Sequence, residues 1–343
     1  MKSRGYTLIE VIAAMAIVLV LLALLLPAVQ AARESSRRIY CTNNLRQLGL
    51  AINLYNTEYG CFPPSTLTSS LSSRPGSSAI ASSCYSPFVR LLNSLDEANL
   101  FNSVNFSFVP DSSSGLVTNS TAMVTHISFL CCPSDQSAFV TGYGRSNYRY
   151  NIGTTPFLVS SNPILDKTFS NEFSGAFEAG ASLSPADFRD GLSRTSAISE
   201  RTRGDWNKGS VRFGGDYQLG NIGYQTLNAN GALAACKAIN SNPNHIFESR
   251  GGESWFISGL HFTAYNQCAP PNHFDTDCSF VNSVGSVHDR HMVDGVFSAS
   301  SSHAQGVNVL FMEGSVRFIK DTVSLSLWRS IATRSGGDLA DID

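Results

Sequence analysis

An unbroken apolar run near the N-terminus, from Val11 to Val29, constrains this chain more than any other feature. A helix of that length rises about 1.5 Å per residue and spans roughly 28 Å, close to the ~30 Å hydrocarbon core of a membrane. The leader before it is short and basic, and it ends in Gly5. A secretory signal is cleaved after its apolar stretch, whereas Gly5 lies before this one. We therefore expect the helix to stay in the mature protein as a single-pass anchor.

One acidic residue, Glu10, stands at the front of the apolar run. A carboxylate deep in a membrane costs about 2.5 kcal/mol or more, so it normally has a partner there. A position at the level of the lipid headgroups is the alternative, because the positive end of the helix dipole favours an acid. The residues alone leave both interpretations open.

The segment Gly5-Tyr6-Thr7-Leu8-Ile9-Glu10 resembles the N-terminus of type IV prepilins and type II secretion pseudopilins. The resemblance implies that a prepilin peptidase cuts after Gly5 and methylates the new N-terminus, Tyr6, where most members carry Phe. It also implies that Glu10 pairs with the terminal amino group of a neighbouring subunit when helices stack into a filament. The expected partners are therefore this peptidase, other pilin-like subunits and the inner membrane.

Composition points to a domain outside the cytoplasm. Only 15% of the residues are charged, and the net charge of −2 becomes −4 when the leader, with Lys2 and Arg4, is lost. The sequence lacks the excess of basic residues that would indicate a nucleic-acid partner. The domain should face the periplasm or the cell exterior. Arg33, Arg37 and Arg38 follow the apolar run and argue against this orientation by the positive-inside rule, but we give the prepilin-like segment more weight.

The rest of the sequence predicts an α+β fold in which a long helix packs on a loop-rich, mainly antiparallel β domain, and the resemblance implies that this arrangement is pilin-like. An apolar stripe continues the helix at four- and three-residue steps, through Cys41, Leu45, Leu48, Ile52, Tyr55 and Tyr59. Gly60 and the following Phe62-Pro63-Pro64 should end it. We divide the chain into a leader (1–5), a transmembrane part (6–30), an amphipathic continuation (31–60) and a β-rich extracytoplasmic domain (61–343).

Within that domain, two shorter elements are predicted. Residues 87–101 have the pattern of a short amphipathic helix. Near the C-terminus, the runs 307–312 and 315–319 flank Glu313-Gly314 and predict a β-hairpin. The first position of a tight turn there would need positive φ, which Glu tolerates less well than Asn or Asp.

The middle and end of the chain resemble a large bacterial family of unknown function, which joins a prepilin-type N-terminus to a C-terminal motif of His, nine residues and Asp-Gly. Here the motif reads His303, nine residues, then Glu313-Gly314, with Glu in place of Asp. Other matching segments are Cys41 to Gly49, Phe62 to Pro64, Cys132 to Asp135, Asp190 to Thr195, Glu200-Arg201 and Trp328 to Gly337. The resemblance implies an envelope-anchored, pilin-like protein and no known activity.

Eight cysteines in an oxidising compartment predict disulfides, although several buried thiols are the alternative. Eight cysteines allow 105 complete pairings, so the sequence does not fix the connectivity. We expect at least two bonds in the domain, and Cys268–Cys278 is the first candidate because these residues are close in sequence. Cys41 and Cys132 lie in segments that match the family, and a bond between them would tie the helix to the domain.

Motifs for catalysis are missing from the sequence, and we predict no catalytic residue, no metal, no cofactor and no enzymatic activity. His288, His291 and Asp294 have a spacing at which a metal site is conceivable. Their glycine-containing surroundings favour a loop closed by a disulfide. His303 could act as a general base, but no nucleophile is identifiable beside it, and a structural role before the hairpin is favoured.

The sequence therefore favours a membrane-anchored subunit that resembles pilins or pseudopilins and assembles through its N-terminal helix. The alternative is an anchored envelope protein that binds a glycan or another ligand and never polymerises. An anchored hydrolase is a third and weaker hypothesis.

Overall fold

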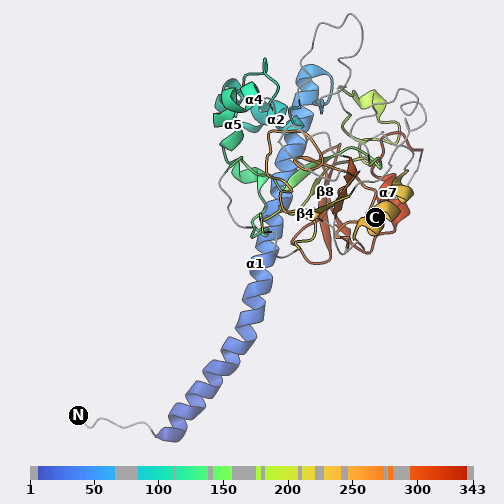
Figure 1. The fold of residues 1–343 in the computed structure, drawn as a ribbon. Helices are drawn as coiled ribbons and strands as arrows, with labels where there is room; N and C mark the ends of the chain where they lie inside the picture. Colours follow the sequence, from blue (N-terminus) through green and yellow to red (C-terminus); the bar gives the residue numbers. More distant parts are fainter. Residues whose placement is uncertain are drawn as a thin grey trace, which may run out of the picture.

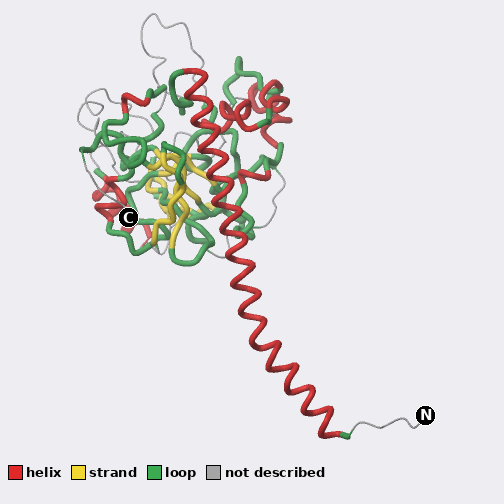
Figure 2. Tube along the Cα trace, turned by 180° about the vertical axis from the view of Figure 1, so that it is seen from behind, coloured by secondary structure: helices red, strands yellow, loops and turns green. Residues whose placement is uncertain are grey.

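The computed structural model describes residues 7–65, 84–110, 113–137, 142–156, 175–178, 182–207, 211–220, 228–240, 246–273, 275, 277–280 and 294–337. The fold is α+β, as the sequence predicted: a long N-terminal helix carries a domain with two small, mixed sheets (Figure 1). The strands gather beside the upper part of the helix, and its lower part projects away from the domain (Figure 2).

The N-terminal helix, α1, runs without a break over Leu8–Tyr59. Thr7 caps its start, and the side chains of Thr7 and Glu10 form a capping box there. Gly60 ends it in the left-handed conformation, with φ of 71°, a position that glycine adopts without the steric cost of a Cβ. Side chains are exposed from the start of α1 to Arg33, and the first buried one is Cys41. The domain therefore covers only the second half of the helix.

The remaining described helices are short, and most surround the second half of α1 or the sheets. The one predicted over residues 87–101 is divided, because Asp96 takes a left-handed conformation with φ of 62° and interrupts it. The helices are α2 Pro87–Leu91, η2 Leu92–Leu95, α3 Ala98–Asn102, α4 Ser113–Thr118, α5 Ser120–Val124, η3 Ser128–Leu130, η4 Pro185–Asp187, α7 Ala229–Asn240 and α9 Leu325–Ser330.

The first sheet has the strand order β5-β1-β2-β8-β9 and the second β4-β3-β6-β7. Pairing is parallel between β1 and β5 and between β3 and β6, and antiparallel in the other described pairs. The first sheet consists of β1 Tyr148–Asn151, β2 Ser196–Glu200, β5 Ala264–Tyr265, β8 Gly306–Phe311 and β9 Val316–Lys320. The second consists of β3 Tyr217–Leu219, β4 Ile246–Glu248, β6 Asp277–Ser279 and β7 Gly295–Val296. A buried ion pair between Arg201, after β2, and Asp277, in β6, joins the two sheets.

The predicted hairpin is confirmed as β8 and β9, which pair from Gly306 opposite Lys320 to Leu310 opposite Val316. The residue with positive φ in its loop is Gly314, at 104°. Glu313 has no positive φ, so the Glu that precedes the glycine carries none of the backbone strain that the sequence suggested.

The main core lies where α1 meets the first sheet and the short helices. Leu45, Leu48 and Ile52 of α1 are buried against side chains that include Phe88 and Leu310. Full burial of such a side chain contributes about 1.5–3 kcal/mol, so this stripe is enough to fix the second half of α1 on the domain.

Candidate functional site

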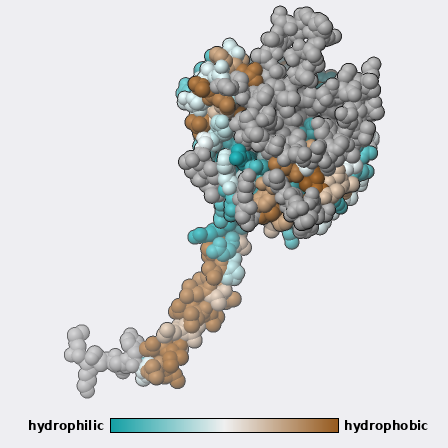
Figure 3. Space-filling model, viewed as in Figure 1, coloured by the Kyte–Doolittle hydropathy of each residue, from teal (hydrophilic) through white to brown (hydrophobic). Residues whose placement is uncertain are grey.

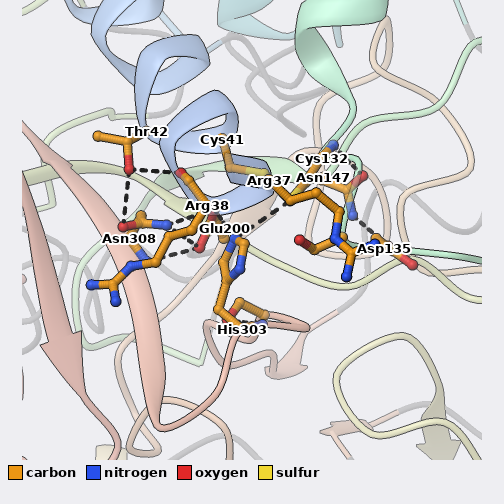
Figure 4. A network of polar contacts seen from close by, with 12 residues as sticks. Arg37, Arg38, Cys41, Thr42, Cys132, Asp135, Asn147, Glu200, His303 and Asn308 are labelled. Carbon is orange, nitrogen blue, oxygen red and sulfur yellow. Dashed lines mark hydrogen bonds and ion pairs between the residues drawn. A yellow bond between two sulfur atoms is a disulfide. The ribbon is translucent and has the colours of Figure 1, made fainter. Parts of the chain in front are cut away.

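The histidine of the C-terminal motif lies at the junction of α1 and the domain (Figure 4). His303, in the loop before β8, has a side chain that is only 1% exposed. Its Nδ1 is 2.7 Å from Oε1 of Glu34 in α1, and its Nε2 is 3.4 Å from Oε1 of Glu200 at the end of β2. The imidazole therefore bridges a carboxylate of the helix and a carboxylate of the sheet.

The two carboxylates control the charge of this imidazole. Burial alone would lower the pKa of His303, but the neighbouring Glu200 and Glu34 raise it above its ordinary value. Burial likewise would raise the pKa of Glu34, but His303 and Arg37 lower it. The ring is thus held protonated to a higher pH than a free histidine, and it forms an ion pair with both acids.

Residues of β8 and α1 hold Glu200 in place. The backbone N–H of Asn308 donates to Oε2 of Glu200 at 2.8 Å, and the Asn308 side chain donates to Oε1 at 3.0 Å. The hydroxyl of Thr42, one residue beyond Cys41 in α1, donates to Oδ1 of Asn308 at 3.4 Å. Antiparallel pairing of β2 with β8 brings these residues together.

A disulfide between Cys41 of α1 and Cys132, just after η3, closes the same junction. Its Cys132 sulfur lies 3.6 Å from Nε2 of His303. Asn147, just before β1, accepts a hydrogen bond from the backbone N–H of Cys132 at 3.0 Å and so fixes its position. The bond between helix and domain that the sequence suggested is therefore present.

The first candidate disulfide, Cys268–Cys278, is wrong. Cys278 in β6 is bonded to Cys236 of α7, a helix that packs on β6 and β7. The thiol of Cys268 instead donates to the carbonyl of Thr154 at 3.0 Å. Proximity in sequence was misleading, because the docking of α7 and not the short loop decides which sulfur faces Cys278.

The other end of the motif contacts α1 about two to three turns nearer its C-terminus than Cys41. Asn53 donates to the backbone carbonyl of Glu313 at 3.2 Å. A Cβ on Gly49 would lie 3.1 Å from the Cα of Gly314, so the helix and the loop approach each other closely at two glycines. The Glu313 carboxylate itself accepts from Ser315 and is 3.6 Å from Arg317. It lies outside the His303 junction, in the turn between β8 and β9.

A cavity of about 580 Å³ opens beside the junction, between α1 and the segment after α5. Its lining includes Arg37, Tyr40, His126, Asp135, Arg145 and Arg203. Asp135 is paired with Arg203 and Arg212. Burial would raise the pKa of Asp135, but the two guanidinium groups lower it below its ordinary value. The cavity wall is therefore mixed: apolar surface makes up most of it, and the guanidinium groups of Arg37, Arg145 and Arg203 are the positive groups in it.

Several residues singled out in the sequence lie elsewhere. Gly5 and Tyr6, and the pair His288 and His291, fall outside the described residues. Glu10 lies in the first turn of α1, where its carboxylate accepts from the backbone N–H of Thr7 at 2.8 Å and from the Thr7 hydroxyl at 2.9 Å.

Sequence reasoning found His303 but not its partners. One signal was available: Cys41, Cys132, Glu200 and His303 all belong to segments that carry the resemblance to the bacterial family of unknown function. The structure shows that those distant segments meet at one place. Glu34, by contrast, belongs to none of the matching segments and was not identifiable.

Comparison with known families gives two matches. Residues 1–26 match the prokaryotic N-terminal methylation motif. Residues 30–326 match a family described as protein of unknown function (DUF1559). No curated protein and no solved structure matches the chain.

Proposed function

Because the chain belongs to the DUF1559 family of proteins of unknown function and carries the prokaryotic N-terminal methylation motif, we propose that it is a pilin-like subunit that assembles through α1. In this proposal a prepilin peptidase cuts after Gly5 and methylates Tyr6. The mature helix anchors the protein in the inner membrane, and the domain faces the periplasm or the cell exterior. A type IV pilus or a type II secretion-like system is the machine that such a subunit serves.

The exposed half of α1 carries the proposal. Its apolar side chains range from 44% exposed at Val29 to 78% at Leu8, and they form a continuous hydrophobic surface below the domain (Figure 3). Among the described helices, α1 is the one with the length and composition of a membrane span. An apolar surface of this size needs lipid or other apolar helices around it, and like helices supply such surroundings in a filament.

We propose no catalytic activity for the protein. The described groups at ion-pair or hydrogen-bond distance from the His303 ring are two carboxylates and the Cys132 sulfur of a disulfide. Ion pairs on both sides of the ring support a structural role, since a general base needs a nitrogen free to accept a proton.

Processing is tested on the mature N-terminus. We expect native protein to begin at N-methyl-Tyr6, because the retained helix follows the cleavage point, and Gly5→Ala to block the conversion. Mass spectrometry of protein from the native envelope reads both. An intact Met1 terminus, or a cut beyond the apolar run, would overturn the prediction.

Assembly is tested with Glu10→Val. Inside a bundle of helices the Glu10 carboxylate needs a cation, and the amino group of Tyr6 on a neighbour supplies it in this arrangement. We expect the variant to be processed, folded and retained in the inner membrane, but absent from sheared filaments and crosslinked ladders. Glu58→Val is the matched control, because Glu58 is exposed at the far end of α1. This variant should assemble as the wild type does.

Identical ladders from wild type and Glu10→Val would contradict the pairing. A wild type that gives no ladder under any condition would favour the alternative, an anchored envelope protein that binds a glycan or another ligand. The observation that supports this second candidate is the cavity beside α1, with guanidinium groups in its wall.

A further inference from the structure

Four buried side chains converge at the junction of α1 and the domain. They are Cys41 of α1, Cys132 after η3, Glu200 of β2 and His303 before β8, and one potential metal-ligand atom from each lies within 4.8 Å of all the others. Two sulfurs, an imidazole nitrogen and a carboxylate oxygen are a donor set that suits zinc. The four donors come from four separate segments of the chain. One ion bound to all four donors would therefore connect these segments.

The distances at the histidine fit a tetrahedral ion. With zinc bonds of about 2.0–2.1 Å to nitrogen and oxygen and about 2.3 Å to sulfur, tetrahedral ligands lie roughly 3.3 Å (nitrogen to oxygen) and roughly 3.5 Å (nitrogen to sulfur) apart. Nε2 of His303 is 3.4 Å from Oε1 of Glu200 and 3.6 Å from the Cys132 sulfur. Nε2 of His303 therefore already lies at tetrahedral ligand spacing from two of the other donors.

The surrounding hydrogen bonds also fit. A zinc-bound histidine usually donates its other ring N–H to a carboxylate, which orients the ring. Nδ1 of His303 is 2.7 Å from Oε1 of Glu34. Asn308 holds the Glu200 carboxylate through its backbone N–H on Oε2 and its side-chain amide on Oε1, and Oε1 also faces Nε2 of His303. Both side-chain ligands are thus held in place by groups that are not ligands.

We propose that Cys41, Cys132, Glu200 and His303 bind one Zn²⁺ when the two cysteines are reduced, so that the disulfide and the zinc site are alternative closures of this junction. Either closure connects α1 to the domain. The proposal does not depend on whether the subunit polymerises.

The exchange balances with a dithiol as the reductant. Two electrons and two protons pass from the dithiol to the Cys41–Cys132 bond, which breaks into two thiols while the dithiol becomes a disulfide. Zn²⁺ then displaces both thiol protons, and any proton on Nε2 of His303, to solvent. The sulfurs separate to roughly 3.8 Å, the spacing of two thiolates on a tetrahedral zinc.

The test uses the full chain in detergent, reduced with a phosphine that is removed before titration with Zn²⁺ or Co²⁺. We expect the reduced wild type to bind one equivalent that the reduced His303→Gln variant does not bind, with a thiolate-to-cobalt charge-transfer band and tetrahedral cobalt bands. His126→Gln, at an exposed histidine in the cavity, is the matched control and should keep the equivalent.

A second variant guards against loss of folding in His303→Gln. Glu34→Gln changes a side chain that is 35% exposed, so the fold should survive, and the zinc affinity should fall by about 10- to 100-fold. Zn²⁺ should also raise the melting temperature of reduced wild type and not that of reduced Cys41→Ser. Equal metal stoichiometry in reduced wild type and reduced His303→Gln would overturn the proposal, as would an oxidised chain that binds the His303-dependent equivalent.

Discussion

At the scale of single residues, Asp135 shows how a buried charge is compensated. Its side chain is 1% exposed and paired with Arg203 and Arg212. Because its pKa is lowered in the folded state, its contribution to stability is present above the ordinary pKa near 4 and is lost as the pH falls through the folded value. We predict that Asp135→Asn lowers the free energy of unfolding by about 3 kcal/mol at pH 7, since removing one partner leaves buried guanidinium charge unpaired.

Denaturant unfolding at pH 7 and at pH 3 measures this effect, and the difference between variant and wild type should shrink at the lower pH. Asp96→Asn is the control, because Asp96 is exposed and Asn tolerates its left-handed backbone. A difference that grows on acidification would contradict the assignment.

At the scale of elements, the Cys41–Cys132 bond fastens α1 to the domain across a sequence separation of 91 residues. The chain-entropy model gives about 4.6 kcal/mol for a loop of that length. We predict that the double variant Cys41→Ser, Cys132→Ser loses stability of that order, measured as the denaturant midpoint under oxidising conditions. Cys61→Ser should cost little, because Cys61 is partly exposed and belongs to neither disulfide.

Peptide mapping of non-reduced protein gives an independent check of the same bonds. Cys41 should appear linked to Cys132 and Cys236 to Cys278, with four cysteines open to alkylation after unfolding. Recovery of a Cys268–Cys278 peptide would contradict the connectivity.

At the scale of the whole molecule, one continuous helix, α1, has an exposed first part and a second part that the domain covers. Buried positions of α1 begin at Cys41, and the positions from Leu8 to Arg33 are exposed. We predict that a chain lacking residues 1–30 is monodisperse without detergent and melts within a few degrees of the full chain in detergent. Size-exclusion chromatography and thermal unfolding measure both. Aggregation of the truncated chain, or a large fall in melting temperature, would show that the apolar segment contributes to the fold of the domain.

Features that depend on neighbouring residues could be predicted from the sequence. The apolar run sets a membrane-length helix, Gly60 ends it, and two β-prone runs around Glu313-Gly314 form a hairpin, because helix periodicity, capping and strand alternation act over a few residues. The division at Asp96 was missed, since a single left-handed residue leaves the apolar pattern of residues 87–101 intact.

Contacts between groups that are distant in sequence could not be predicted in this way, because they follow from how the elements pack. His303 is flanked by Glu34 and Glu200 because β2 pairs with β8 and α1 packs on β8 and β9. Cys278 bonds to Cys236, and not to Cys268, which is nearer in sequence, because α7 docks on β6. Such partners depend on strand order and on helix packing, which buried apolar area over the whole domain selects, and no local pattern in the sequence encodes them.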